Sequence, residues 1–210
     1  MKHLVLIGDS IFDNQAYING GADVTAHLIN QMPSDWKATL RAVDGSTVET
    51  AARQISGLPG DATHLIVSAG GNNAILHADI LQEKARSSAE VLIRLAEIAN
   101  EFEDLYRSML QDLLSLKKST AVCTIYYPQF PEPSIQKSAV AALTVFNDAI
   151  IRQAFLAGVP LIDLRLVCNE QDDYANEIEP SEKGGGKIAA AILRLVENHN
   201  FEKRRTEVFF

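Results

Sequence analysis

The chain has 210 residues, of which 47% are hydrophobic and 22% are charged, and this composition is typical of a soluble globular protein. That length can bury one substantial core and is short for two, so we expect residues 1–210 to form a single domain. The net charge of -8 and the sequence pI of about 5.1 argue against nucleic acid as a partner, because binding a polyanion needs clustered lysine and arginine.

The chain begins with a short apolar run, residues 4–7 (LVLI), that ends in Gly8-Asp9-Ser10. Such a run is typical of a strand buried on both faces of a parallel sheet. This strand would deliver the hydroxyl of Ser10 to the carboxyl edge of the sheet, where open α/β sheets bind ligands. Alternatively, Asp9 or Ser10 caps a following helix. The run is too short for a signal peptide or a membrane span, so we expect a cytoplasmic protein.

Two further strands are predicted in the first third of the chain. A helical segment at 22–30 precedes a strand at 39–43, which ends near Gly45 before another helix. Taken alone, Gly45 is a turn glycine ahead of a helix cap. Residues 63–68 (THLIVS) predict a third buried strand, which ends shortly before Asn72.

From residue 81 to about residue 116, apolar residues recur every three or four positions, which predicts one long or once-kinked amphipathic helix. This helix covers the sheet, and its long apolar stripe also suits a homodimer contact. Residues 120–127 predict a fourth strand, and residues 138–157 predict a helix that ends at Gly158. Residues 159–164 predict the fifth strand.

Five strands that alternate with helices predict a three-layer, doubly wound α/β fold with a five-stranded parallel sheet. A flavodoxin-like strand order, 2-1-3-4-5, places the ends of the first three strands side by side. Ser10, Gly45 and Asn72 would then converge at one edge of the sheet.

Gly8-Asp9-Ser10, Gly45 and Gly70-Gly71-Asn72, at three successive strand ends, resemble the first three motif blocks of the SGNH (GDSL-type) hydrolases, a family of esterases and lipases. The resemblance implies an ester hydrolase with the SGNH fold and with Ser10 as its nucleophile. It also implies that the backbone N–H groups of Ser10 and Gly45 and the side-chain amide of Asn72 form an oxyanion hole. The sequence has no zinc motif, phosphate loop or dinucleotide fingerprint, so we expect no cofactor and no metal.

The last family block, Asp-x-x-His-Pro, differs in this chain. Glu179 precedes Pro180 at the histidine position, and Asn176 stands at the aspartate position. A carboxylate with an ordinary pKa of about 4.3 is a poor proton acceptor at pH 7, unless burial raises the pKa. We expect the Asn176 amide to donate a hydrogen bond to the Glu179 carboxylate, which would make the two replacements one coupled change. His77, in the loop after the third strand, is an alternative base.

Two functions follow from this pattern. One is an acyl hydrolase of weak or atypical activity on a small-molecule ester, and the other is an inactive protein that binds an acyl- or acetyl-bearing ligand. Cys123 and Cys168 lie in or near apolar segments and have no second ligand at metal spacing, so we expect them to be core residues. The apolar end at 208–210 either folds back on the domain or contacts a partner.

Overall fold

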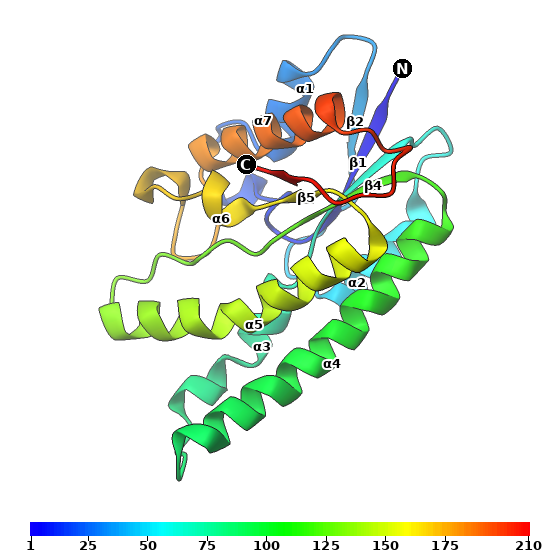
Figure 1. Ribbon diagram of the computed structural model, residues 1–210. Helices are drawn as coiled ribbons and strands as arrows, with labels where there is room; N and C mark the ends of the chain where they lie inside the picture. The colour runs from blue at the N-terminus through cyan, green and yellow to red at the C-terminus, as the bar shows by residue number, and fades with distance from the viewer.

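The structure is a computed structural model that covers residues 1–210, and it is a parallel sheet between two layers of helices (Figure 1). The sheet has six strands in the order β2-β1-β3-β4-β5-β6, and every neighbouring pair is parallel. The strands are β1 His3–Gly8, β2 Lys37–Leu40, β3 His64–Ser68, β4 Ser119–Cys123, β5 Leu161–Ile162 and β6 Val208–Phe209. The predicted three-layer fold and the order 2-1-3-4-5 are confirmed. The predicted count of five strands is one too low, because the chain end pairs with β5.

The helices of the two layers are α1 Val24–Gln31, α2 Val48–Arg53, α3 Gly71–Leu76, α4 Ser88–Ser115, α5 Pro133–Ala157, α6 Leu164–Val167 and α7 Glu182–Asn198. Helices α1 and α7 cover one face of the sheet, and α2, α4 and α5 cover the other (Figure 1). Alternate residues of β1 serve the two faces, since Leu4 and Leu6 belong to the first core cluster and Val5 and Ile7 to the second.

The two long helices begin at different residues from those predicted. Helix α4 begins at Ser88, because the Ser87 side chain caps it, and residues 78–82 form a separate 3-10 helix, η3 Ala78–Gln82. Helix α5 begins at Pro133, which suits the first turn, and Glu132 caps it by accepting a hydrogen bond from the Ile135 N–H at 2.7 Å. Helix α5 is long and apolar enough to cross a membrane by length and composition, a test that a core helix also passes.

The two halves of helix α4 make different contacts. Its second half packs on the sheet through Phe102, Tyr106, Met109 and Leu113, as the apolar periodicity predicts. Its first half extends past the sheet, and Leu95 and Ile98 of this half line a cavity (Figure 1). The homodimer contact stays a prediction.

The turn after β1 is held very close to the end of β3. Gly8 has a φ of +137°, and a Cβ on it would lie 1.7 Å from the carbonyl oxygen of Ser68, so only glycine fits. The Gln54 side chain accepts from the N–H of Gly8 and donates to its carbonyl, both at 2.9 Å. These contacts fix the short loop that carries Ser10.

The two cysteines are free and buried, as predicted for core residues. Burial raises the pKa of the Cys168 thiol to about 12 and that of the Cys123 thiol still further. Both thiols therefore stay protonated at neutral pH and are poor nucleophiles.

Candidate active site

Ser10 follows β1 at the carboxyl edge of the sheet, and only 8% of its surface is exposed. Its hydroxyl donates a hydrogen bond to Oε1 of Glu179, at a distance of 3.1 Å. The two residues are 169 positions apart in the sequence, so the fold itself brings them together.

Glu179 lies in the loop before α7, and only 5% of its surface is exposed. Burial, together with the nearby charge of Asp44, raises the pKa of this carboxyl from 4.5 to about 7, although the hydrogen bond from Ser10 opposes the shift. The second carboxylate oxygen, Oε2, is buried and has no hydrogen-bond partner within the chain. Glu179 thus combines contact with the serine hydroxyl and a pKa close to neutrality.

Asn176 does not contact the Glu179 carboxylate, and the expectation that its amide orients that group is wrong. The side chain is exposed, and its oxygen accepts hydrogen bonds from the backbone N–H groups of Ile178 and Glu179, both at 2.9 Å. An asparagine side chain readily closes such a turn on its own backbone. Asn176 therefore shapes the loop that carries Glu179 and leaves the carboxylate free.

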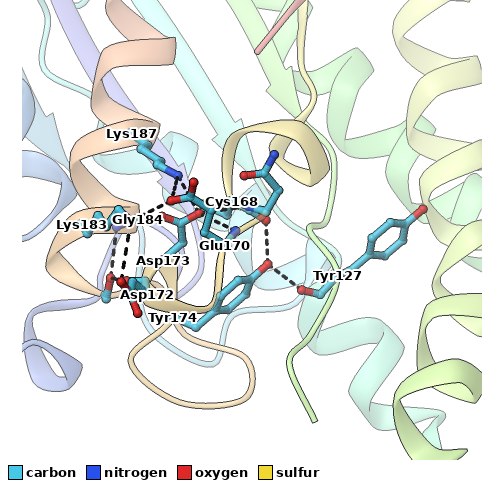
Figure 2. A network of polar contacts seen from close by, with 11 residues as sticks. Tyr127, Cys168, Glu170, Asp172, Asp173, Tyr174, Lys183, Gly184 and Lys187 are labelled. Atoms are coloured by element: carbon cyan, nitrogen blue, oxygen red, sulfur yellow. Dashed lines mark hydrogen bonds and ion pairs between the residues drawn. The ribbon is translucent and has the colours of Figure 1, made fainter. Parts of the chain in front are cut away.

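The buried side chain of Asp173 holds the same loop in place, a role that was not predicted from the sequence. Its side chain is fully buried, and its Oδ2 accepts from the N–H groups of Asn169 and Glu170 at 3.0 and 2.9 Å. Lys187 reaches down from α7 and donates to the same oxygen at 2.8 Å (Figure 2). The sequence places Lys187 on the final helix and Asp173 in an acidic segment before it. Such a pair of opposite charges usually indicates an exposed ion pair.

Further contacts tie this loop to the rest of the protein. The Tyr174 hydroxyl lies 2.8 Å from the carbonyl of Tyr127 and 2.7 Å from that of Cys168 (Figure 2). The N–H of Ser181 donates to the Asp173 carbonyl at 2.9 Å, and the Ser181 side chain caps α7. The position of Glu179 relative to Ser10 is therefore fixed by α7 and by the segment after β4.

Asn72 and Gly45 lie on neighbouring segments of the same sheet edge. The side-chain amide of Asn72 donates one hydrogen bond, of 3.0 Å, to the carbonyl of Ser46, which leaves its second N–H available. The N–H groups of Ser10 and Gly45 have no hydrogen-bond partner within the chain. Asn73 ties this region together, since its oxygen accepts from the Val48 N–H at 2.9 Å.

A second buried carboxyl belongs to Asp9, next to the serine in the chain, for which the sequence suggested only a capping role. Burial, followed by the charge of Glu179, raises its pKa from 3.8 to about 7, although the N–H of Ile11 donates to it at 3.2 Å. Two carboxyls with pKa values near 7 thus line the same cavity as the serine.

A cavity of about 370 Å³ opens at this edge of the sheet. Ser10, Asn72 and Glu179 line it, as expected, whereas Gly45 and Asn176 do not. His77 also lines the cavity, but the Ser10 hydroxyl bonds to Glu179, so His77 does not take the place of the base in this structure.

An α/β sandwich with a buried serine at the end of its first strand, facing a cavity, is an arrangement suited to nucleophilic chemistry. The sequence matches the GDSL-like Lipase/Acylhydrolase family over residues 6–185, and the chain belongs to this family. The family resemblance inferred from the motifs is thereby confirmed, and the family consists of hydrolases of ester bonds. No curated protein matches the sequence.

Solved structures with the same fold cover nearly the whole chain. A lipolytic protein of the G-D-S-L family from Veillonella parvula is 15% identical, with a TM-score of 0.70 over 95% of this chain and 100% of that one. An alpha/beta hydrolase enzyme from the metagenome of Lake Arreo, Spain, is 21% identical, with a TM-score of 0.68 over 95% and 96%. Phospholipase A1 from Streptomyces albidoflavus is 15% identical, with a TM-score of 0.65 over 92% and 98%. At these identities the likeness shows the fold alone.

Proposed function

We propose that this chain is a serine acyl hydrolase for carboxylic esters, in which Ser10 is the nucleophile and Glu179 is the proton acceptor. The observation that carries the proposal is the buried hydrogen bond of 3.1 Å from the Ser10 hydroxyl to the Glu179 carboxylate. A base must lie within hydrogen-bond reach of the proton it removes, and Glu179 meets that requirement.

The environment of Glu179 supports the same role. An ordinary carboxylate has too low a pKa to accept a serine proton efficiently, but the Glu179 pKa of about 7 approaches that of the histidine found in most serine hydrolases. Near neutral pH the Glu179 carboxyl is partly ionised, so its ionised form can accept the serine proton. Its protonated form can then give that proton to the leaving alcohol. Burial thus gives this glutamate the near-neutral pKa that an ordinary carboxyl lacks.

The reaction proceeds in two halves. The Ser10 oxygen attacks the ester carbonyl carbon while its proton passes to Glu179, and the tetrahedral intermediate then expels the alcohol, which takes that proton as it leaves. Water then attacks the acyl-serine ester, Glu179 again accepts the proton, and the acid is released as Ser10 regains its proton. Asn72 and the free N–H group of Ser10, which both line the cavity, are the donors we assign to the developing oxyanion.

One observation favours a second function, an inactive protein that binds an acyl- or acetyl-bearing ligand. No residue orients the Glu179 carboxylate as the family aspartate orients its histidine, since Oε2 has no partner and Asn176 bonds only to backbone. Such a site would keep the cavity without activating the hydroxyl.

Labelling with a fluorophosphonate separates the two functions, because the reagent reacts only with an activated serine. We expect labelling of the parent protein, none in Ser10→Ala, and strongly slowed labelling in Glu179→Gln. Glu177→Gln, an exposed position in the same loop, is the matched control and should label like the parent. A folded parent protein that does not label supports the binding function instead.

A further inference from the structure

We propose that the acyl group of the substrate is a linear, uncharged hydrocarbon chain of medium length, and that it lies in the cavity between α3, α4 and α5. This inference rests on the proposed function, because it places the ester carbonyl at Ser10 and the acyl chain in the cavity beyond it. The family name alone leaves the acyl group open, since the similar structures include lipases and acetyl xylan esterases.

The wall of the cavity is mainly hydrophobic. Of 29 lining residues, 18 are hydrophobic, and they continue away from Ser10 along three helices. Leu95 and Ile98 come from the first half of α4, and Ala142, Leu143 and Phe146 from α5. In Figure 1 these parts of α4 and α5 extend past the sheet on the same side as α3, and at their inner end Ile98 and Phe146 also pack on the core of the sheet.

The charged groups of the cavity are confined to one end. No lysine or arginine lines the cavity, and the acidic groups in it, Asp9 and Glu179, both lie at the Ser10 end. A carboxylate or phosphate on the acyl chain would find no cation and two carboxyls that repel it. A sugar would leave many of its hydroxyls without partners, because His77, Gln82, Ser134 and Ser138 are the only polar side chains of the wall outside the Ser10 end. An apolar chain matches the greater part of the wall.

The rim of the cavity is rich in exposed apolar side chains. Ile75, Leu81 and Ile135 line the cavity and are also 50%, 43% and 50% exposed. Gln82, Ser134 and Ser138 are the exposed polar residues of the lining. Leu76, beside them on α3, is exposed as well. Clustered exposed apolar side chains are uncommon on a monomer unless they serve binding. Here they adjoin the cavity, and an acyl chain entering from this side would cover them.

The size is adequate for such a chain. The cavity volume of about 370 Å³ falls within the range of roughly 300 to 1,000 Å³ that is typical of small-molecule sites. Each methylene moved from water into an apolar wall contributes about 0.8 kcal/mol, which is roughly fourfold in affinity. An acetyl group would use almost none of this wall, whereas an octanoyl or decanoyl group would use most of it.

The test measures kcat/KM for p-nitrophenyl esters from acetate to decanoate. We expect an increase of roughly twofold to fourfold per added methylene until the cavity is filled, and then a plateau. The inference is overturned if the protein hydrolyses the acetate ester at least as well as the octanoate and decanoate esters.

Filling variants locate the chain within the cavity. Ala142→Phe, or Ala139→Leu one turn earlier on α5, should lower the ratio of decanoate to acetate hydrolysis at least tenfold, because the added side chain fills space that only the longer acyl chain uses. Ala141→Phe is the matched control, since Ala141 lies on the same helix, is exposed, and does not line the cavity. An unchanged decanoate-to-acetate ratio in both filling variants, with the fold intact by circular dichroism, refutes the location.

A binding measurement separates failure of this inference from failure of the proposed hydrolase function. In Ser10→Ala, which cannot form an acyl-serine, methyl decanoate should displace the uncharged dye Nile red, and methyl acetate should not. If this displacement occurs while the parent protein hydrolyses none of the esters, the acyl site stands and the hydrolase function fails. If neither ester displaces the dye and acetate is hydrolysed, the hydrolase function stands and the acyl site fails.

Discussion

Replacing Glu179 with glutamine should remove catalysis and at the same time stabilise the fold at high pH. The carboxyl is 5% exposed, and its pKa in the folded protein is raised from 4.5 to about 7. A raised pKa means that the folded state prefers the protonated form, so the ionised group costs stability as pH rises from about 4.5 through 7. Above that range the cost is constant. Glutamine keeps the shape and the acceptor oxygen for Ser10 but never ionises.

The magnitude follows from the pKa shift. One pKa unit corresponds to about 1.36 kcal/mol, so at pH 8 the ionised carboxyl costs about 3 kcal/mol, whereas at pH 5 it costs about 1 kcal/mol. The stability of Glu179→Gln relative to the parent should therefore rise by about 2 kcal/mol between pH 5 and pH 8. A pH-independent effect, such as an unpaired amide N–H of the new glutamine, cancels in this difference.

Urea unfolding of parent and variant at both pH values measures the effect, with the free energies obtained by linear extrapolation. Glu177→Gln, exposed in the same loop, should show no such pH-dependent difference. If Glu179→Gln gains no stability relative to the parent between pH 5 and pH 8, Glu179 is not the group with the raised pKa. The argument for it as a base at neutral pH then fails as well.

Three further predictions concern catalysis and the loop that carries the serine. With p-nitrophenyl octanoate, Ser10→Ala should remove nearly all hydrolysis. Asn72→Ala should lower kcat about 10² to 10³-fold, which is the usual loss for one oxyanion donor. Equal rates in the parent and both variants would contradict the proposed site. The kcat/KM profile should rise through about pH 7 and then level off, because Glu179 acts as a base only when ionised, and a profile flat from pH 5 to 8 would contradict this. Gly8→Ala should cost about 3 kcal/mol or more in urea unfolding, because its Cβ would overlap a backbone carbonyl, whereas Gly60→Ala, with open space around it, should change little.

The fold was predictable because its signals are local and repeated. Each buried strand is a short apolar run closed by glycine, proline or a polar turn, and each crossover helix has its own apolar periodicity. The sixth strand was missed because Val208–Phe209 pairs over only two residues, and so short a run has no periodicity of its own. It forms because β5 presents an open edge, which no local pattern reveals.

The candidate site was predictable in its positions and less so in its contacts. Strand order fixes where Ser10 and Asn72 lie, because parallel strand ends share one edge of the sheet, and the motif around Pro180, just before the final helix, predicts the position of Glu179. The partners of each side chain depend on loop geometry, and Asn176 illustrates this, since it bonds to its own turn. Asp9 was overlooked because its effect depends on burial beside another carboxyl, which only the folded structure brings about.

The double variant Asn176→Asp with Glu179→His tests whether the rest of the site is still built for the usual chemistry of serine hydrolases. Histidine at 179 would stand within reach of the Ser10 hydroxyl, because the loop is held by Asp173 and α7, which do not depend on the Glu179 side chain. An aspartate at 176 can keep one oxygen on the backbone N–H groups that Asn176 now binds, and its second oxygen is then free for the imidazole.

We expect kcat/KM of the double variant on p-nitrophenyl octanoate to exceed that of the parent at pH 7 to 8, and Glu179→His alone to gain less. Loss of the orienting carboxylate costs about 10⁴-fold in kcat in the serine protease case, which is the upper bound for the gap between the two variants. Asn176→Asp alone is the matched control and should not exceed the parent rate, because a second carboxylate beside Glu179 raises the pKa of that base and lowers its ionised fraction at pH 7 to 8. A double variant that folds, binds Nile red and yet stays at the parent rate would mean that the donors around Ser10 do not form an oxyanion site, since the base and its partner would then be present without effect.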